Sequence, residues 1–292
     1  MPTCLRHLVL FTLFTLIATP SPASATDLVA VKVTEEAVID GRADEAFWAR
    51  ATAVTSRDPV AAIDITLKAA HNGEKIFLLA AFADETENRE HRTLKWDAAI
   101  GAYVNGPERE DVLVLKWSMV SYPFGLTLRE TVPYQADIWF WKAMRTDPSG
   151  YADDKMHLYR GDKMKDSTML VSRDGTVFYL SRPGDQGDAA YHTTLYTGFK
   201  GERVPKYEQR HPSGSRADIQ AKGVWRDKGW TIEFARALDT GHADDVRFTI
   251  GGRHPFAVSR YEIAGRKAEP EAQQPLYGTG EVGELFFLVF EQ

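Results

Sequence analysis

The chain of 292 residues contains a single cysteine, Cys4, which lies in an N-terminal segment that we expect to be removed. A mature chain without cysteine forms no disulfide, no cysteine-ligated zinc site and no iron–sulfur cluster, and it has no thiol nucleophile. It also lacks the C-x-x-C-H motif that attaches c-type haem covalently. These classes of protein are therefore excluded together.

An excess of positive charge is also missing. The formal net charge is −6, so the sequence lacks the basic footprint of a nucleic-acid-binding protein. Hydrophobic residues make up 43% and charged residues 26% of the chain, which is a globular composition. No repeat or clean linker divides the sequence, and we predict a single domain over residues 26–292.

Long apolar runs are absent as well. Leu8–Ala18 is the longest candidate, but it is much shorter than the roughly 20 residues that a membrane-spanning helix needs. Arg6 precedes this run, and Ala23-Ser24-Ala25 follows it as an A-x-A cleavage signal. Residues 1–25 are therefore predicted to be a secretory signal peptide cleaved after Ala25, which implies a periplasmic protein. A retained anchor is the less favoured alternative.

Common catalytic motifs are missing. The sequence has no G-x-S-x-G, no H-E-x-x-H and no P-loop. The letters of Gly278–Gly283 match G-x-G-x-x-G, but a predicted strand follows where a dinucleotide site needs a helix. Asp153-Asp154 and Asp244-Asp245 offer oxygen ligands for Ca²⁺ but lack EF-hand spacing. We interpret these acids as solvated turn residues.

Alternating apolar residues and turn signals predict many short strands. The fold class is predicted to be all-β, an antiparallel β-sandwich with a few short helices in long loops. Two helices are expected, over Ala43–Arg50 and Ile138–Met144. The expected strands are Ile63–Ala69, Ile76–Phe82, Val112–Met119, Thr176–Leu180, Ala217–Trp225, Trp230–Ala235, Val246–Ile250, Phe256–Ser259 and Leu285–Phe290.

Four segments carry a resemblance to known families. Ile39–Trp48 resembles the opening of sandwich domains of the carbohydrate-module-9 or DOMON-like type. Together with Glu110–Met119, Ala136–Thr146 and Ala221–Leu238, it resembles the haem-binding family of the ethylbenzene dehydrogenase γ subunit. That family includes the γ subunits of dimethylsulfide dehydrogenase, selenate reductase and chlorate reductase. The resemblance covers roughly residues 36 to 290.

The resemblance implies one non-covalent haem b, held by a methionine thioether and a lysine amine. It maps these ligands onto Met119 and Lys222, with Trp139 and Trp141 as packing groups near the haem edge. The implied role is electron transfer rather than catalysis. The implied partners are the molybdopterin catalytic subunit and iron–sulfur subunit of an oxidoreductase, or a c-type cytochrome.

The sequence leaves alternatives open for the haem ligands, the propionate partners and the function. Met119 shares a strand face with apolar residues, whereas Lys222 lies on a polar face and must lose its proton before its amine can bind iron. Substitute ligands are the histidines His71, His91, His157 and His192. Candidate partners of the haem propionates are Arg145, Lys142 and Lys155. The rival functions are a carbohydrate-binding module, in which exposed Trp139 and Trp141 stack on sugars, and a haem-free structural domain.

Overall fold

The computed structural model describes residues 26–57, 63–120, 126–260 and 284–292. The predicted signal peptide and the Gly278–Gly283 turn lie outside these residues. The strands are β1 (Thr26–Lys32), β2 (Val54–Arg57), β3 (Asp64–His71), β4 (Lys75–Ala83), β5 (Leu94–Asp97), β6 (Ala102–Asn105), β7 (Val112–Ser118), β8 (Tyr134–Lys142), β9 (Asp153–Arg160), β10 (Thr168–Val171), β11 (Val177–Ser181), β12 (Tyr191–Thr193), β13 (Arg203–Val204), β14 (Tyr207–Gln209), β15 (Gln220–Arg226), β16 (Gly229–Ala237), β17 (Arg253–Arg260) and β18 (Phe286–Phe290). The described part of the chain has three short 3₁₀ helices, η1 (Ala46–Ala49), η2 (Asp147–Ser149) and η3 (Gly214–Ala217).

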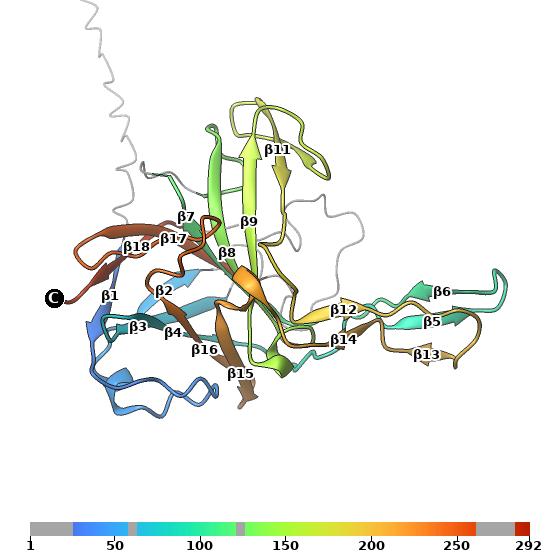
Figure 1. Cartoon of the computed structure of the whole chain (residues 1–292), viewed down its shortest axis with the longest axis horizontal. Helices are drawn as coiled ribbons and strands as arrows, with labels where there is room; N and C mark the ends of the chain where they lie inside the picture. Colours follow the sequence, from blue (N-terminus) through green and yellow to red (C-terminus); the bar gives the residue numbers. More distant parts are fainter. Residues whose placement is uncertain (1–25, 58–62, 121–125, 261–283) are drawn as a thin grey trace, which may run out of the picture.

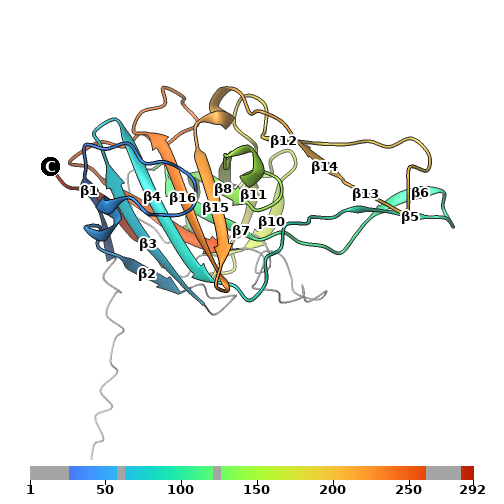
Figure 2. The same cartoon turned by 90° about the horizontal axis from the view of Figure 1, so that it is seen from below.

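Thirteen strands form one sheet that folds over on itself. Its order is β10-β11-β9-β8-β7-β17-β18-β1-β3-β4-β16-β15, with β2 paired to β3. Figure 2 shows β1, β3, β4, β16 and β15 side by side as one layer, with β7 and β8 behind them. The largest hydrophobic cluster contains residues from both halves of the sheet, such as Leu67 of β3 and Leu115 of β7. The prediction of an all-β sandwich is therefore confirmed.

The pairing is mixed rather than purely antiparallel. β1 lies between β18 and β3 and pairs with both in parallel, whereas the other strand pairs are antiparallel. A smaller sheet of β13, β5 and β6, with the β12–β14 pair at its base, extends away from the sandwich (Figure 1). Two separate segments therefore build this extension, one between β4 and β7 that carries β5 and β6 and one between β11 and β15 that carries β12, β13 and β14.

The helix predicted over Ile138–Met144 is wrong, because these residues continue β8 through Lys142. Trp139 and Trp141 face the main core, while Ile138 faces a second core on the other side of the sheet. A strand buried on both faces has no polar alternation, so its sequence pattern does not distinguish it from a buried helix. The helix expected at Ala43–Arg50 is reduced to η1.

The strand predicted over Val246–Ile250 is also wrong. These residues form a loop, and the backbone N–H of Val246 donates to Oδ2 of Asp137 at 3.0 Å instead of joining a strand ladder. This loop crosses the end of the sandwich near the point where β7 ends. It therefore supplies one wall of the pockets at that end.

Candidate functional site

The two tryptophans of the predicted site are buried core residues. Trp139 and Trp141 are fully buried, with ring centroids 5.2 Å from Trp117 and 4.8 Å from Trp230 respectively. The indole N–H of Trp141 donates to Oδ1 of Asp147 at 2.9 Å. Neither ring is exposed for stacking on a sugar. Both rings pack in the largest hydrophobic cluster of the sandwich.

Lys222 lies in a polar cluster around buried Asp147. Its amine donates to the backbone oxygen of Asp147 at 3.0 Å and to Oδ2 at 3.3 Å, and its side chain is 33% exposed. Arg89 contacts the same carboxylate at 2.7 Å, and the backbone N–H of Gly223 donates to it at 2.6 Å. Lys222 therefore already has an anionic partner in this structure.

Met119 lies at the opposite end of β8 from Lys222. The backbone N–H of Met119 donates to the oxygen of Gln135, whereas Gly223 packs against Trp141. Gln135 and Trp141 are six residues apart on β8, which corresponds to about 20 Å along a strand. Two axial ligands of one iron must lie within a few ångströms of it. The structure does not bring Met119 and Lys222 together.

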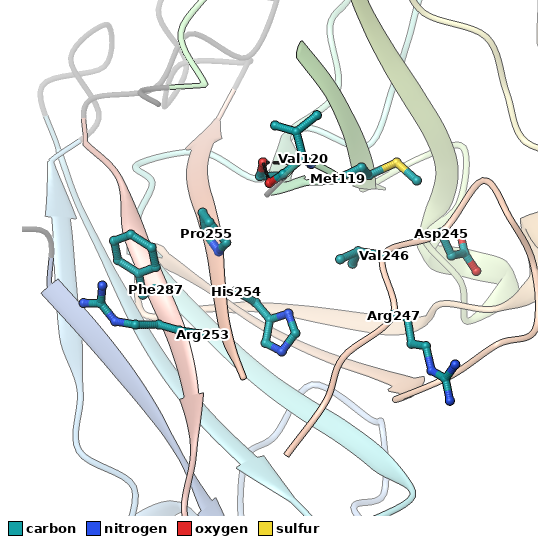
Figure 3. Close-up of a pocket in the computed structure, with 10 residues that line it drawn as sticks. Met119, Val120, Asp245, Val246, Arg247, Arg253, His254, Pro255 and Phe287 are labelled. Atoms are coloured by element: carbon teal, nitrogen blue, oxygen red, sulfur yellow. Dashed lines mark hydrogen bonds between the residues drawn. The ribbon is translucent and has the colours of Figure 1, made fainter. Parts of the chain in front are cut away.

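Met119 does line a pocket. It follows the last residue of β7 and reaches a space of about 360 Å³ bounded by Val246, His254 and Phe287 (Figure 3). Its sulfur accepts a hydrogen bond from Nε2 of Gln135 at 3.4 Å. A volume of this size is at the lower end of the range for small-molecule sites, about 300–1,000 Å³.

His254 is the residue that the sequence reasoning missed. β17 pairs with β7 up to Phe256 opposite Trp117, and continuing this register by two residues beyond the ladder leads to His254 and Met119. Phe256 and Trp117 stack in the main core, and the same strand face continues to His254 and Met119. Alternation within β17 places His254 on the same face as Phe256, but the sequence alone does not show that this strand lies beside β7.

The imidazole of His254 is partly anchored. Its ring lies 5.2 Å from that of Phe248 in an edge contact, and Nε2 lies 3.1 Å from the nitrogen and 3.2 Å from the oxygen of Thr249. Burial lowers the pKa of His254, and the hydrogen bond to Thr249 only partly offsets this. The ring is therefore neutral at neutral pH, as a metal ligand must be.

The four histidines considered as substitutes lie elsewhere. His71 is buried on β3, where its Nε2 contacts the backbone oxygen of Glu291 at 2.9 Å. His91 packs near Tyr207, and burial together with nearby cations lowers its pKa to about 2. His157 is buried on β9, and His192 lies on β12. None of them lines the pocket of Met119.

The predicted propionate partners are also elsewhere. Lys142 and Arg145 form buried ion pairs with Asp153 and Glu110. The cations at the Met119 pocket are instead Arg247 and Arg253, whose side chains are 72% and 50% exposed. Both are exposed and already paired, Arg247 with Asp239 at 3.0 Å and Arg253 with Asp27, and Asp245 adds a carboxylate to the same lining.

Buried acids gather between this pocket and a second one. Asp137 on β8, Asp154 on β9 and Asp245 in the Val246 loop bring carboxylate oxygens within 4.8 Å of one another. Burial raises the pKa of Asp154 well above its usual range, and repulsion by neighbouring carboxylates adds to the shift. Burial likewise raises the pKa of Asp245 to about 7. Asp154 and Asp245 are thus not solvated turn acids, and that interpretation was wrong.

The family model described as ethylbenzene dehydrogenase matches residues 27–269. The chain belongs to this family. The ethylbenzene dehydrogenase match spans the strands that carry Met119 and His254, and it supports the resemblance found in the sequence. Among curated proteins, none matches the chain.

Solved structures show a distant likeness in fold. A carbohydrate-binding module of family 9 from Caldicellulosiruptor kristjanssonii in complex with glucose has 9% identity and a TM-score of 0.41, and the alignment covers 91% of this chain and 96% of that one. The same kind of module in complex with cellotriose has 10% identity and a TM-score of 0.40, with coverages of 91% and 94%. Within the described residues, no helix is long and apolar enough to cross a membrane.

Proposed function

We propose that this chain is a periplasmic, non-catalytic electron-transfer subunit or partner protein that binds one non-covalent haem b. Membership of the ethylbenzene dehydrogenase family supports this role. Its partners would be the molybdopterin catalytic subunit and iron–sulfur subunit of an oxidoreductase, or a c-type cytochrome. The absence of cysteine after residue 25 is consistent with a haem that has no covalent attachment.

The observation that supports the proposal is that Met119 and His254 line the same pocket. A thioether and an imidazole form a donor set that suits haem iron. The two exposed arginines at the rim would pair with the propionates in exchange for Asp239 and Asp27. We therefore propose Met119 and His254 as the axial ligands, because Lys222 lies at the far end of β8. When bound, the haem would supply one-electron chemistry.

The residues of the chain would have separate tasks at this pocket. His254 is held by Thr249 and Phe248 and kept neutral by burial, so its ring would need little reorganisation to bind a metal. Met119 would supply a soft ligand that favours ferrous iron over ferric iron. Phe287 and Val246 would exclude water from the apolar part of the pocket.

The test is reconstitution of the purified mature chain with haemin, followed by absorption spectroscopy and redox titration. The wild type should give a low-spin spectrum with one haem per chain. His254→Gln should shift it toward high spin, whereas Met119→Leu should lower the reduction potential. Lys222→Met is the matched control and should leave the spectrum unchanged.

Two results would contradict the proposal. A wild-type chain that gives no Soret band with excess haemin would remove the electron-transfer role. A spectrum that changes in Lys222→Met but not in His254→Gln would identify Lys222 as an axial ligand and reject His254.

A further inference from the structure

The buried acidic cluster supplies no ligand to the proposed haem iron, although one of its members, Asp245, lines the same pocket. It consists of Asp137, Asp154 and Asp245, whose relative exposures are 0%, 0% and 8%. Two of these residues come from adjacent strands of one sheet layer, and the third comes from the loop that crosses the end of the sandwich. The cluster therefore joins a loop to the sheet at one point.

The oxygens of this cluster are largely unpartnered. In the described part of the chain, five carboxylate oxygens of the cluster have no hydrogen-bond partner. They are both oxygens of Asp154, both oxygens of Asp245 and Oδ1 of Asp137. Buried polar atoms are nearly always paired, because leaving them without a partner costs free energy. Asp154 is completely buried, and one of its carboxylate oxygens lies within 4.8 Å of an oxygen of each of the other two acids.

The charges of the cluster are not balanced by the chain. Arg236 pairs with Asp137 at 2.6 Å, and its distance to Asp245 is 3.9 Å. The guanidinium of Arg236 lies 4.9 Å from the ring centroids of both Trp139 and Phe248, and these contacts restrict its position. Asp185 adds a further carboxylate beside Asp154. Two guanidinium groups therefore face four buried or half-buried acids, Arg236 at Asp137 and Asp245 and Arg216 near Asp185.

We propose that Asp137, Asp154 and Asp245 bind a single Ca²⁺ ion, with Asp185 as an additional oxygen ligand or a partner of the bound water. Carboxylate oxygens without nitrogen or sulfur donors select hard cations. Ca²⁺–oxygen distances of about 2.3–2.6 Å place opposed ligand oxygens about 5 Å apart. One oxygen from each of the three carboxylates lies within 4.8 Å of the others, which is close enough for all three to contact one such ion.

Calcium fits this site better than magnesium. Mg²⁺ requires a compact octahedron and keeps several waters, whereas Ca²⁺ accepts irregular shells of carboxylates from separate segments. An entry path also exists, because Asp185 lines a second pocket of about 630 Å³ and Asp245 lines the Met119 pocket. An ion could therefore reach the cluster from solvent through either opening.

A bound ion would fix the loop that carries Asp245 and Val246. Without it, repulsion among the acids weakens the attachment of this loop to β8 and β9. The expected effect is a rise in the melting temperature on calcium binding. Saturation at about 100 times the dissociation constant should raise it by about 5–10 °C for a domain of this size.

The experiment uses the purified mature chain, stripped with EGTA and free of added haem. Differential scanning fluorimetry with and without millimolar CaCl₂, and with MgCl₂ instead, measures the shift. Isothermal titration with CaCl₂ measures the stoichiometry, which should be one. Asp154→Asn should abolish both the shift and the binding. Asp147→Asn is the control, since it alters a buried carboxylate outside the cluster and should keep the calcium response.

Asp245→Asn serves as the second variant if Asp154→Asn does not fold, and it should reduce the calcium affinity at least tenfold. The proposal is overturned if the wild type binds no calcium and melts at the same temperature with EGTA and with CaCl₂. In that case shared protons, rather than a metal ion, neutralise the acids. An equal response to MgCl₂ rejects the assignment to calcium. Haem binding is measured separately by its Soret band, so its failure leaves this test intact.

Discussion

Asp147 holds the far end of β8 against β15, and its removal is the sharpest test of how that end is stabilised. Its carboxylate accepts hydrogen bonds from the indole of Trp141 and the backbone of Gly223, at 2.9 and 2.6 Å, and both donors are buried. Arg89 and Lys222 contact the other oxygen at 2.7 and 3.3 Å. Asp147→Ala removes all four acceptor contacts at once.

The size of the loss in stability depends on which donors water can reach once the Asp147 carboxylate is removed. Trp141 and Gly223 would each be left with an unsatisfied N–H, at a cost of about 1–3 kcal/mol apiece. Arg89 and Lys222 are about one-third exposed and can be hydrated, so each contributes only about 0–1 kcal/mol. These contributions sum to a loss of about 2–8 kcal/mol, which lowers the melting temperature by about 4–30 °C.

The assay is urea unfolding followed by tryptophan fluorescence. Asp147→Asn, which keeps one oxygen as an acceptor, should lose clearly less stability than Asp147→Ala. Lys222→Met should cost no more than about 1 kcal/mol. The reasoning is refuted if Asp147→Ala costs less than about 1 kcal/mol, or if Lys222→Met is as destabilising as Asp147→Ala.

Two further predictions concern packing and acid stability. Gly223→Ala places a Cβ 2.5 Å from the Trp141 ring and should cost about 1–3 kcal/mol in urea unfolding, whereas the control Gly161→Ala, which meets open space, should be nearly neutral. Burial raises the pKa of Asp153, but its two cationic partners lower it well below the usual range. The stabilisation by the ionised Asp153 carboxylate is complete above about pH 4 and is lost as the pH falls further. The Asp153→Asn variant should therefore be less stable than the wild type at neutral pH, but it should lose less stability between about pH 5 and pH 2. An equal loss of stability in acid for both proteins would contradict this.

Much of the fold was predictable because most strands are buried on one face more than the other. The alternation in β3 and β4 and the Asn-Gly turn between them predict that hairpin closely. β8 was not predictable in this way, since its two faces enter different cores. The Val246 loop was missed because a buried carboxylate, rather than a neighbouring strand, pairs its backbone.

The candidate site was only partly predictable. Met119 could be placed on the apolar face of β7 from alternation alone. His254 could not be connected with it, because the register between β7 and β17 depends on contacts far apart in the sequence. Asp154 and Asp245 look like turn acids for the same reason, since each becomes buried only through segments distant in the chain.

The parallel placement of β1 has a consequence for folding. Thr26 pairs with Phe286, and the same strand continues into pairing with β3, so β1 and β18 close the centre of the sheet rather than its edge. Pairings between segments so distant in sequence form slowly, because a large loop must be ordered before any contact compensates for it. The two layers can each begin to form by local hairpins. They become one continuous sheet only when β18 arrives, and loss of β18 would leave β1 and β17 as unpaired edges in the middle of the molecule.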